Sequence, residues 1–147
     1  MSFFQGKISS NIFINLVSRP SINWSNFELD SSLQLNDFVD LLLDPIKSSH
    51  YRYRIKLGLH EALVNAVKHG NKLDPHKSIR VRRIITPNWC VWQIQDQGNG
   101  LEIKKRIYKL PEKQSNVNGR GLYIINECFD DIRWSNKGNR LQLALKR

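Results

Sequence analysis

The sequence predicts an α/β fold, an α+β two-layer sandwich in which helices cover one face of a mixed, mainly antiparallel sheet. Three observations support this prediction. A helical apolar pattern over residues 51–69 is followed by two alternating segments around a turn at Pro87, and a last pair of short strands flanks residues 136–139. Because the chain has 147 residues and shows no linker or repeat, we expect one domain over residues 1–147.

The helix predicted over residues 51–69 has a broad apolar face and a narrow polar line. At about 100° per residue, six apolar side chains gather on one face: Ile55, Leu59, Ala62, Leu63, Ala66 and Val67. Glu61, Asn65 and His69 follow at four-residue spacing, so they project in one direction. Gly70 is a C-cap signal that ends the helix. The polar line is either a functional surface or the wet edge of a helix without chemistry.

Shorter elements are predicted on both sides of this helix. Two further helices are expected over residues 32–43 and 122–128. Strands are expected over residues 11–17, 79–86, 89–95, 131–135 and 140–145. The polar segments 71–77 and 101–117 are connections, and the second is expected to be mobile and to contain a short helix.

Composition indicates a globular protein of the cytoplasm. Apolar residues make up 40% of the chain and charged residues 24%, which is ordinary for such proteins. No apolar run reaches the about 18 residues of a membrane span, and the N-terminus lacks a signal-peptide pattern, so we expect no membrane contact. Cys90 and Cys128 are expected to be reduced core residues, and no Cys/His spacing suggests zinc.

The net charge of +10 favours an acidic partner, which could be a nucleic acid, a nucleotide or an acidic protein. The basic residues cluster only locally, at Arg80-Val-Arg-Arg83 and at Lys104-Lys-Arg106. Neither cluster is a long basic tract, and aromatic residues do not alternate with the basic ones. The pattern therefore argues against nucleic acid as the main partner.

Two glycine motifs could surround a nucleotide. In Asp96-Gln-Gly98-Asn-Gly100, the carboxylate could accept a hydrogen bond from adenine N6, and the glycines would let the backbone approach the ring. In Gly119-Arg-Gly121, free N–H groups at a helix start could bind phosphate. Taken alone, the first motif also fits a plain turn and the second a simple loop-to-helix junction.

The polar line of the central helix offers a metal ligand and a base. Asn65 can bind Mg²⁺ through its carbonyl oxygen, since Mg²⁺ prefers few protein oxygens together with phosphates and waters. Glu61, one turn earlier, could take a proton from an attacking hydroxyl or water. The alternative is that the acid and the amide bond to each other or to the backbone.

These motifs together resemble a known family. The segment Glu61-Ala-Leu-Val-Asn65-Ala-Val-Lys-His69-Gly70 resembles the N-box of bacterial anti-sigma-factor serine kinases, which are Bergerat-fold ATPases like gyrase and sensor histidine kinases. The two glycine motifs resemble the family's glycine boxes, and Phe129-Asp-Asp-Ile132 fits the anti-sigma branch. The resemblance covers residues 55–146 and implies a Bergerat-type fold.

The resemblance implies a role for each site residue. Glu61 would be the general base, Asn65 the Mg²⁺ ligand and Asp96 the adenine reader, under a lid over residues 104–118. The ATP-binding residues would be Asn65, His69, Asp96, Gly98, Gly100, Gly119, Arg120, Gly121 and Leu122.

The implied function is an ATP- and Mg²⁺-dependent serine/threonine kinase that acts as an anti-sigma factor. Its substrate would be an anti-anti-sigma protein and its second partner a sigma factor; a homodimer is also compatible with the sequence. The alternatives are a nucleotide-gated binding switch without kinase activity and, with less support, a basic nucleic-acid binder.

Two positions depart from the family pattern. Members often carry an arginine just before the second glycine box, where this chain has Val117-Asn118, and Arg120 or Lys113 is a candidate substitute. The family's Gly-Thr in the last hairpin is Gly138-Asn139 here. Both departures concern the efficiency of phosphoryl transfer more than the fold.

Overall fold

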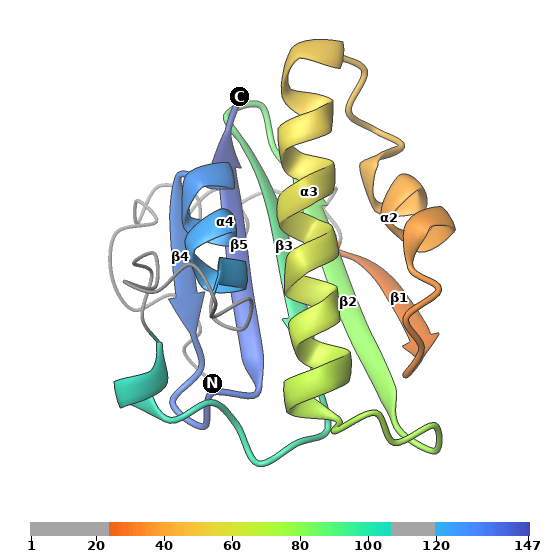
Figure 1. Ribbon diagram of the computed structural model, residues 1–147. Coiled ribbons are helices and arrows are strands. Elements are labelled where there is room, and N and C mark those ends of the chain that lie inside the picture. The colour runs from red at the N-terminus through yellow and green to blue at the C-terminus, as the bar shows by residue number, and fades with distance from the viewer. Residues whose placement is uncertain (1–23, 107–119) are drawn as a thin grey trace.

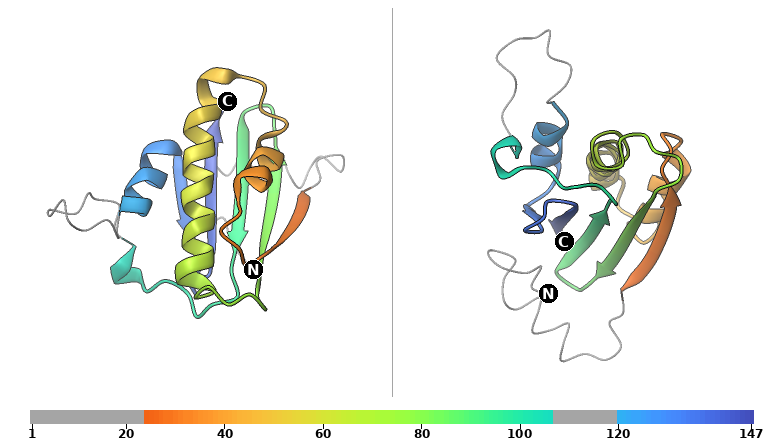
Figure 2. Two further views of the ribbon diagram at one scale, coloured as in Figure 1. Left: turned by 45° about the vertical axis from the view of Figure 1, so that its right-hand side comes forward. Right: turned by 90° about the horizontal axis from the view of Figure 1, so that it is seen from below.

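The computed structural model describes residues 24–106 and 120–147. In this part of the chain, five strands form one sheet in the order β1-β2-β3-β5-β4, and all four pairings are antiparallel. The strands are β1 (Ser25–Asp30), β2 (Ser78–Ile85), β3 (Trp89–Gln95), β4 (Asp131–Trp134) and β5 (Arg140–Lys146). One face of the sheet is covered by α2 (Asn36–Leu43), α3 (Ser49–Asn65) and α4 (Arg120–Cys128) (Figure 1 and Figure 2). The predicted α/β sandwich is confirmed, with antiparallel pairing throughout the described sheet.

The core lies between α3 and the sheet. The predicted apolar face of this helix is confirmed, because all of its members are buried: Ile55, Leu59, Ala62, Leu63, Ala66 and Val67. They belong to one cluster with the inward side chains of the sheet, including the fully buried Trp92. The rings of Trp92 and Phe129 meet edge-on with centroids 6.0 Å apart, so the residue that follows α4 is anchored in the same core.

Most predicted elements agree with the structure to within a few residues, and β3 agrees at both ends. β1 is not predicted, because Ser25–Asp30 contains only two large apolar residues between polar ones. Its strand conformation depends on pairing with β2, which lies far along the chain. The short helix expected in the second connection is the 3₁₀ turn Ile103–Lys105. The strand predicted over residues 11–17 lies outside the described residues, as does the segment 107–117 of that connection.

The central helix ends at Gly70, as predicted, but the prediction that Gly70 itself forms the cap is wrong. The helix continues through a wider π-helical turn, Ala66–Gly70, in which the N–H of Asn71 donates to the carbonyl of Ala66 at 2.8 Å. The left-handed residues that end it are Lys72, with φ 55°, and Leu73, with φ 59°. The N–H of Leu73 reaches back to the carbonyl of Val67 at 2.9 Å, so the cap is formed by the backbone beyond Gly70.

Both cysteines are free thiols buried in the core, as the sequence predicts. Burial raises the pKa of Cys90 and of Cys128 above the ordinary thiol value. A thiol with a raised pKa is a poor nucleophile, so packing is the role that the structure supports for both. No helix in the described ranges is long and apolar enough to cross a membrane.

Gly58 provides a test of how tightly α3 and α4 pack. A Cβ at this position would lie 2.6 Å from Cys128 Cβ and 2.6 Å from a ring carbon of Phe129. Alanine improves helix propensity by about 1 kcal/mol, but overpacking a core costs about 1–3 kcal/mol. Two contacts at 2.6 Å place this site in the upper part of that range, about 2–3 kcal/mol, so after the gain in propensity we expect Gly58→Ala to lower the free energy of unfolding in urea by about 1–2 kcal/mol.

The control for this prediction is Tyr53→Ala, at a position of the same helix that is 78% exposed. It reports helix propensity without packing and should change stability by no more than about 0.5 kcal/mol. A Gly58→Ala protein as stable as the parent would show that α4 can move away from α3 without loss.

Candidate functional site

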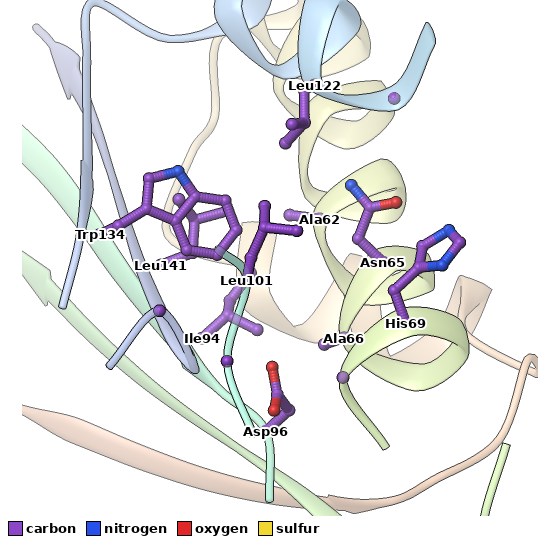
Figure 3. A pocket seen from close by; sticks show the side chains of 14 residues that line it. Ala62, Asn65, Ala66, His69, Ile94, Asp96, Leu101, Leu122, Trp134 and Leu141 are labelled. Carbon is purple, nitrogen blue, oxygen red and sulfur yellow. The ribbon is translucent and has the colours of Figure 1, made fainter. Parts of the chain in front are cut away.

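A pocket of about 270 Å³ opens between the end of α3, the segment after β3, the start of α4 and the β4–β5 hairpin (Figure 3). Six of the predicted ATP-binding residues line it: Asn65, His69, Asp96, Gly100, Gly121 and Leu122. Its volume lies near the lower end of the range for small-molecule sites. The pocket therefore brings together residues from all three sequence motifs.

The polar line of α3 faces the start of α4. A Cβ on Gly121 would lie 3.3 Å from Glu61 Oε2 and 3.3 Å from the amide atoms of Asn65. A larger residue than glycine would therefore occupy the space in front of both side chains. Glu61 does not line the pocket itself but stands at its edge, one helical turn before Asn65.

Asp96 forms the other polar end of the pocket. It directly follows β3, is only 9% exposed, and its carboxylate points into the cavity (Figure 3). Its Oδ1 accepts the N–H of Gly98 at 2.7 Å, which explains why Gly98 supports the site without lining the pocket. Burial raises the pKa of the Asp96 carboxyl, and the Gly98 hydrogen bond and nearby lysines only partly oppose this.

The Cα of Gly70 lies directly against Asp96. A Cβ on Gly70 would come within 2.3 Å of Asp96 Cγ, and a Cβ on Gly98 would come within 2.1 Å of the Gly70 carbonyl oxygen. Such distances are far below van der Waals contact. The glycine at the end of the helix is therefore required by the carboxylate across from it, and a pattern of helix signals alone does not reveal this.

Asn71 holds this corner together and is not identified by the sequence analysis. It is fully buried, and its Nδ2 donates to the carbonyl of Ser78 at 3.0 Å. Its Oδ1 accepts the N–H of Gln97 at 2.8 Å. One amide thus connects the end of the helix to the first residue of β2 and to the turn that carries Asp96. Its only sequence signal is a polar residue next to the N-box.

Two glycines with positive φ bring the segment after β3 against the last hairpin. Gly100 has φ +92° and Gly138 has φ +81°, values that side chains other than glycine rarely adopt. The N–H of Leu101 donates to the carbonyl of Gly138 at 2.9 Å. Next to this contact, Asn139 Nδ2 donates to the carbonyl of Asp96 at 3.4 Å, so the residue that replaces the family's threonine supports the backbone at Asp96.

The remaining wall of the pocket is apolar and includes residues that the sequence analysis does not select. They are Ala62, Ala66, Ile94, Leu101, Trp134 and Leu141. Trp134 projects from β4 toward Leu101 and Leu141 (Figure 3), and the guanidinium of Arg106 lies 5.6 Å from its ring centroid. The alternation of the strands predicts the inward orientation of Ile94, Trp134 and Leu141, but not that these side chains reach a cavity.

Besides Glu61 and Gly98, two further predicted residues are not placed in the pocket. Arg120 is exposed at the first residue of α4 and does not line the cavity, and Gly119 lies outside the described residues.

The pocket as a whole is an apolar slot with the Asp96 carboxylate at one end and the acid–amide pair of Glu61 and Asn65 at the other. A flat ring with an exocyclic amine fits the first end, and a charged extension fits the second.

A comparison with protein families agrees with this geometry. Residues 44–145 match the histidine kinase-like ATPase domain. This chain belongs to that family. Family membership assigns ATP binding and a kinase-like ATPase function to the chain. No curated protein matches it significantly. The matched segment contains every described residue that lines the pocket.

Asp96→Asn should change stability and binding in opposite directions. Because the folded-state pKa of Asp96 is raised, its contribution to stability falls as the pH rises from the unfolded value of about 3.9 through the folded pKa. Asparagine cannot ionise and still accepts the Gly98 N–H. We expect the variant to gain stability relative to the parent across this pH window, and to unfold in urea at pH 7 no earlier than the parent.

The same substitution should weaken nucleotide binding. Asparagine presents no negative charge to an exocyclic amine, so we expect ADP affinity in calorimetry to fall at least about tenfold, or about 1.4 kcal/mol. The control is Asp37→Asn, an exposed acid in the first turn of α2. Equal ADP affinity for Asp96→Asn and the parent would contradict the adenine-reading role.

Proposed function

We propose that this protein is an ATP- and Mg²⁺-dependent protein serine/threonine kinase that acts as an anti-sigma factor and phosphorylates an anti-anti-sigma protein. The observation that carries the proposal is that Glu61 and Asn65 converge on Gly121, whereas Asp96 lies beside Gly70. Between Glu61 and Gly70 the helix advances by about 14 Å. A ligand whose ring contacts Asp96 reaches Glu61 only through an extended chain, and a triphosphate is such a chain.

The residues near Gly121 suit Mg²⁺. Asn65 offers a carbonyl oxygen as a ligand, and the glycine leaves the space before it open. No group of three His, Cys, Asp or Glu side chains in the described ranges could hold a metal alone. Phosphate oxygens and waters would complete the coordination, as Mg²⁺ prefers. The bound ion would neutralise charge on the phosphates during transfer.

Glu61 is the group best placed to act on the phosphate acceptor. It stands at the rim of the pocket, so an incoming hydroxyl can approach it from solvent while the nucleotide fills the slot behind. A carboxylate there can accept the hydroxyl proton as the oxygen attacks the terminal phosphorus. Positioning and charge stabilisation would supply most of the rate enhancement.

The proposed partners follow from the N-box and the charge of the chain. The Glu-Ala-x-x-Asn-Ala-x-x-His-Gly form from Glu61 to Gly70 resembles the anti-sigma branch more than the sensor histidine kinases. A net charge of +10 suits acidic protein partners. Phosphorylation of the antagonist would release it, and the kinase would then bind the sigma factor.

The second candidate function is a nucleotide-gated binding switch without useful kinase activity. Val117-Asn118 stands where members of the family often carry an arginine toward the terminal phosphate, and this observation favours the switch. The deciding experiment is incubation of the protein with radiolabelled ATP, Mg²⁺ and candidate anti-anti-sigma proteins. Transfer of label to a serine or threonine supports the kinase; nucleotide binding without transfer to any candidate supports the switch.

Glu61→Gln and Asn65→Ala should separate chemistry from binding. Loss of a general base typically lowers the rate about 10²- to 10⁴-fold, so we expect the rate of phosphoryl transfer by Glu61→Gln to fall by this factor. Its ADP affinity should stay within about threefold of the parent's. Asn65→Ala removes a metal ligand and should impair both Mg²⁺-dependent binding and transfer. Calorimetry and single-turnover transfer measure the two effects.

The matched control for these variants is His60→Gln, beside Glu61 in sequence but off the polar line. It should leave both measurements unchanged. Transfer by Glu61→Gln at the parent rate would rule out Glu61 as the base, even if the protein proves to be a kinase.

A further inference from the structure

The face of the sheet opposite the helices carries a second hollow. Side chains alternate between the two faces along a strand, so Gln93 of β3 points away from the helices while the next residue, Ile94, lines the nucleotide pocket. The second hollow, called the outer hollow below, has a volume of about 480 Å³. Its charged and amide lining includes Glu28, Arg80, Arg82, Gln93, Gln95 and Arg140.

The register of the sheet explains why these residues meet. Arg80 pairs with Gln95, and Gln95 pairs with Arg140 on the next strand. Two residues further along, Arg82 pairs with Gln93, and Gln93 pairs with Gln142. Directly opposite side chains lie about 4.5–5.5 Å apart at Cβ. The arginines of β2 and β5 therefore lie on both sides of the amides of β3.

Positive charge dominates the outer hollow. Among the described residues, its lining contains three arginines and one acid, Glu28. The nearest pair, Arg80 Nε to Glu28 Oε1, is 3.8 Å long with both side chains more than half exposed, so it is a weak ion pair. The guanidinium of Arg82 lies 4.7 Å from the ring centroid of Trp24. Burial lowers the pKa of Arg140, and the charge of Arg82 lowers it further, as expected for cations held close together.

A buried pair of amides lies next to the outer hollow, and of the two residues Gln93 lines it. Gln93 is 3% exposed and Gln142 is 0% exposed, and their amides form one hydrogen bond of 2.9 Å. Within the described part of the chain, Gln93 Oε1 and Gln142 Nε2 are buried and have no partner. If both side-chain amides are flipped, the hydrogen bond between them is kept, and Gln93 Nε2 and Gln142 Oε1 become the atoms without a partner. A buried polar group without a partner costs about 1–3 kcal/mol, so Gln93, the member of the pair that lines the hollow, favours a ligand with hydrogen-bonding groups.

We propose that the outer hollow binds a small phosphorylated sugar or polyol. The phosphate would lie between Arg80 and Arg82, because guanidinium groups match phosphate oxygens with paired donors. Hydroxyl groups of the ligand would donate to Gln93 Oε1 and to the Glu28 carboxylate. The three arginines supply the attraction, and the amide and the acid supply selectivity for a ligand that also carries hydroxyls.

Nucleic acid fits these observations less well. A nucleic-acid backbone carries many phosphates along a surface, whereas the outer hollow is lined by only a few charged side chains among the described residues. Glu28, at the rim of the hollow, would repel a long polyanion, whereas a single phosphate can avoid it. A compact ligand satisfies both the arginines and the buried amide.

The test is a titration of the ¹⁵N-labelled full chain with ribose 5-phosphate, followed by NMR of side-chain signals. We expect saturable shifts of the Gln93 Nε2 and Arg82 Nε signals, with the Asn65 Nδ2 signal in the nucleotide pocket unchanged. Inorganic phosphate should bind at least about tenfold more weakly, since it lacks the sugar hydroxyls, and ribose should not bind. Shifts at Asn65 alone, or none at millimolar ligand, would overturn the proposal.

Matched variants distinguish a built site from general charge. Arg80→Gln with Arg82→Gln should weaken ribose 5-phosphate at least about tenfold. Lys104→Gln with Lys105→Gln removes the same charge from exposed residues outside the hollow and should have no effect. Equal weakening by both pairs would overturn the proposal, as would tighter binding of a single-stranded oligonucleotide than of ribose 5-phosphate.

Folding of the arginine variants is checked independently. The variant Arg80→Gln with Arg82→Gln should bind ADP with the same affinity as the parent, because the nucleotide pocket lies on the other face of the sheet. Should the double glutamine variant unfold, Arg80→Lys with Arg82→Lys keeps the charge but loses the paired donors, and intermediate ribose 5-phosphate affinity is expected. Parent affinity in the lysine variant would overturn the role of the guanidinium groups.

Discussion

The close contact between the end of the central helix and Asp96 is the constraint on which the pocket depends. Gly70 and Gly98 leave no space for a Cβ on either side of the carboxyl, and Asn71 bonds the helix end to Ser78 and Gln97. An aspartate buried in this way has a raised pKa and is held at a cost in solvation. Such a cost is typical of residues retained for binding rather than for stability.

This contact also determines where the other residues can act. The π-helical turn places Ala66 and His69 in the pocket wall and Gly70 against Asp96. At the opposite end, α4 packs along α3 and presents Gly121 to the acid–amide pair. The two polar ends are therefore separated by the helix from Glu61 to Gly70, and the turn that carries Asp96 is fixed against the end of that helix. Rigid spacing suits an elongated ligand with chemically different ends.

Local periodicity was sufficient to predict some features and insufficient for others. The apolar face of α3, the polar line and the β2–β3 hairpin follow from side-chain spacing within one segment, and the sequence analysis identified them. Gly70, Asn71 and Trp134 owe their roles to residues far away in the chain. β1 is stabilised by pairing with β2, whose register begins about 50 residues later. Such long-range contacts leave no periodic signal, so the sequence does not reveal the roles of Asn71 and Trp134, and it makes Gly70 resemble a simple helix cap.

The basic segment of β2 shows how a sheet divides a charge cluster. Arg83 faces the helices, where its Nη1 donates to the carbonyls of Leu41 and Leu42 at 3.1 and 3.2 Å and completes the end of α2. Arg80 and Arg82 face the opposite side, in the outer hollow. Three arginines that form one cluster in sequence therefore serve two different surfaces. The net charge of +10 consequently does not describe one basic patch, and each arginine needs an explanation from its own neighbours.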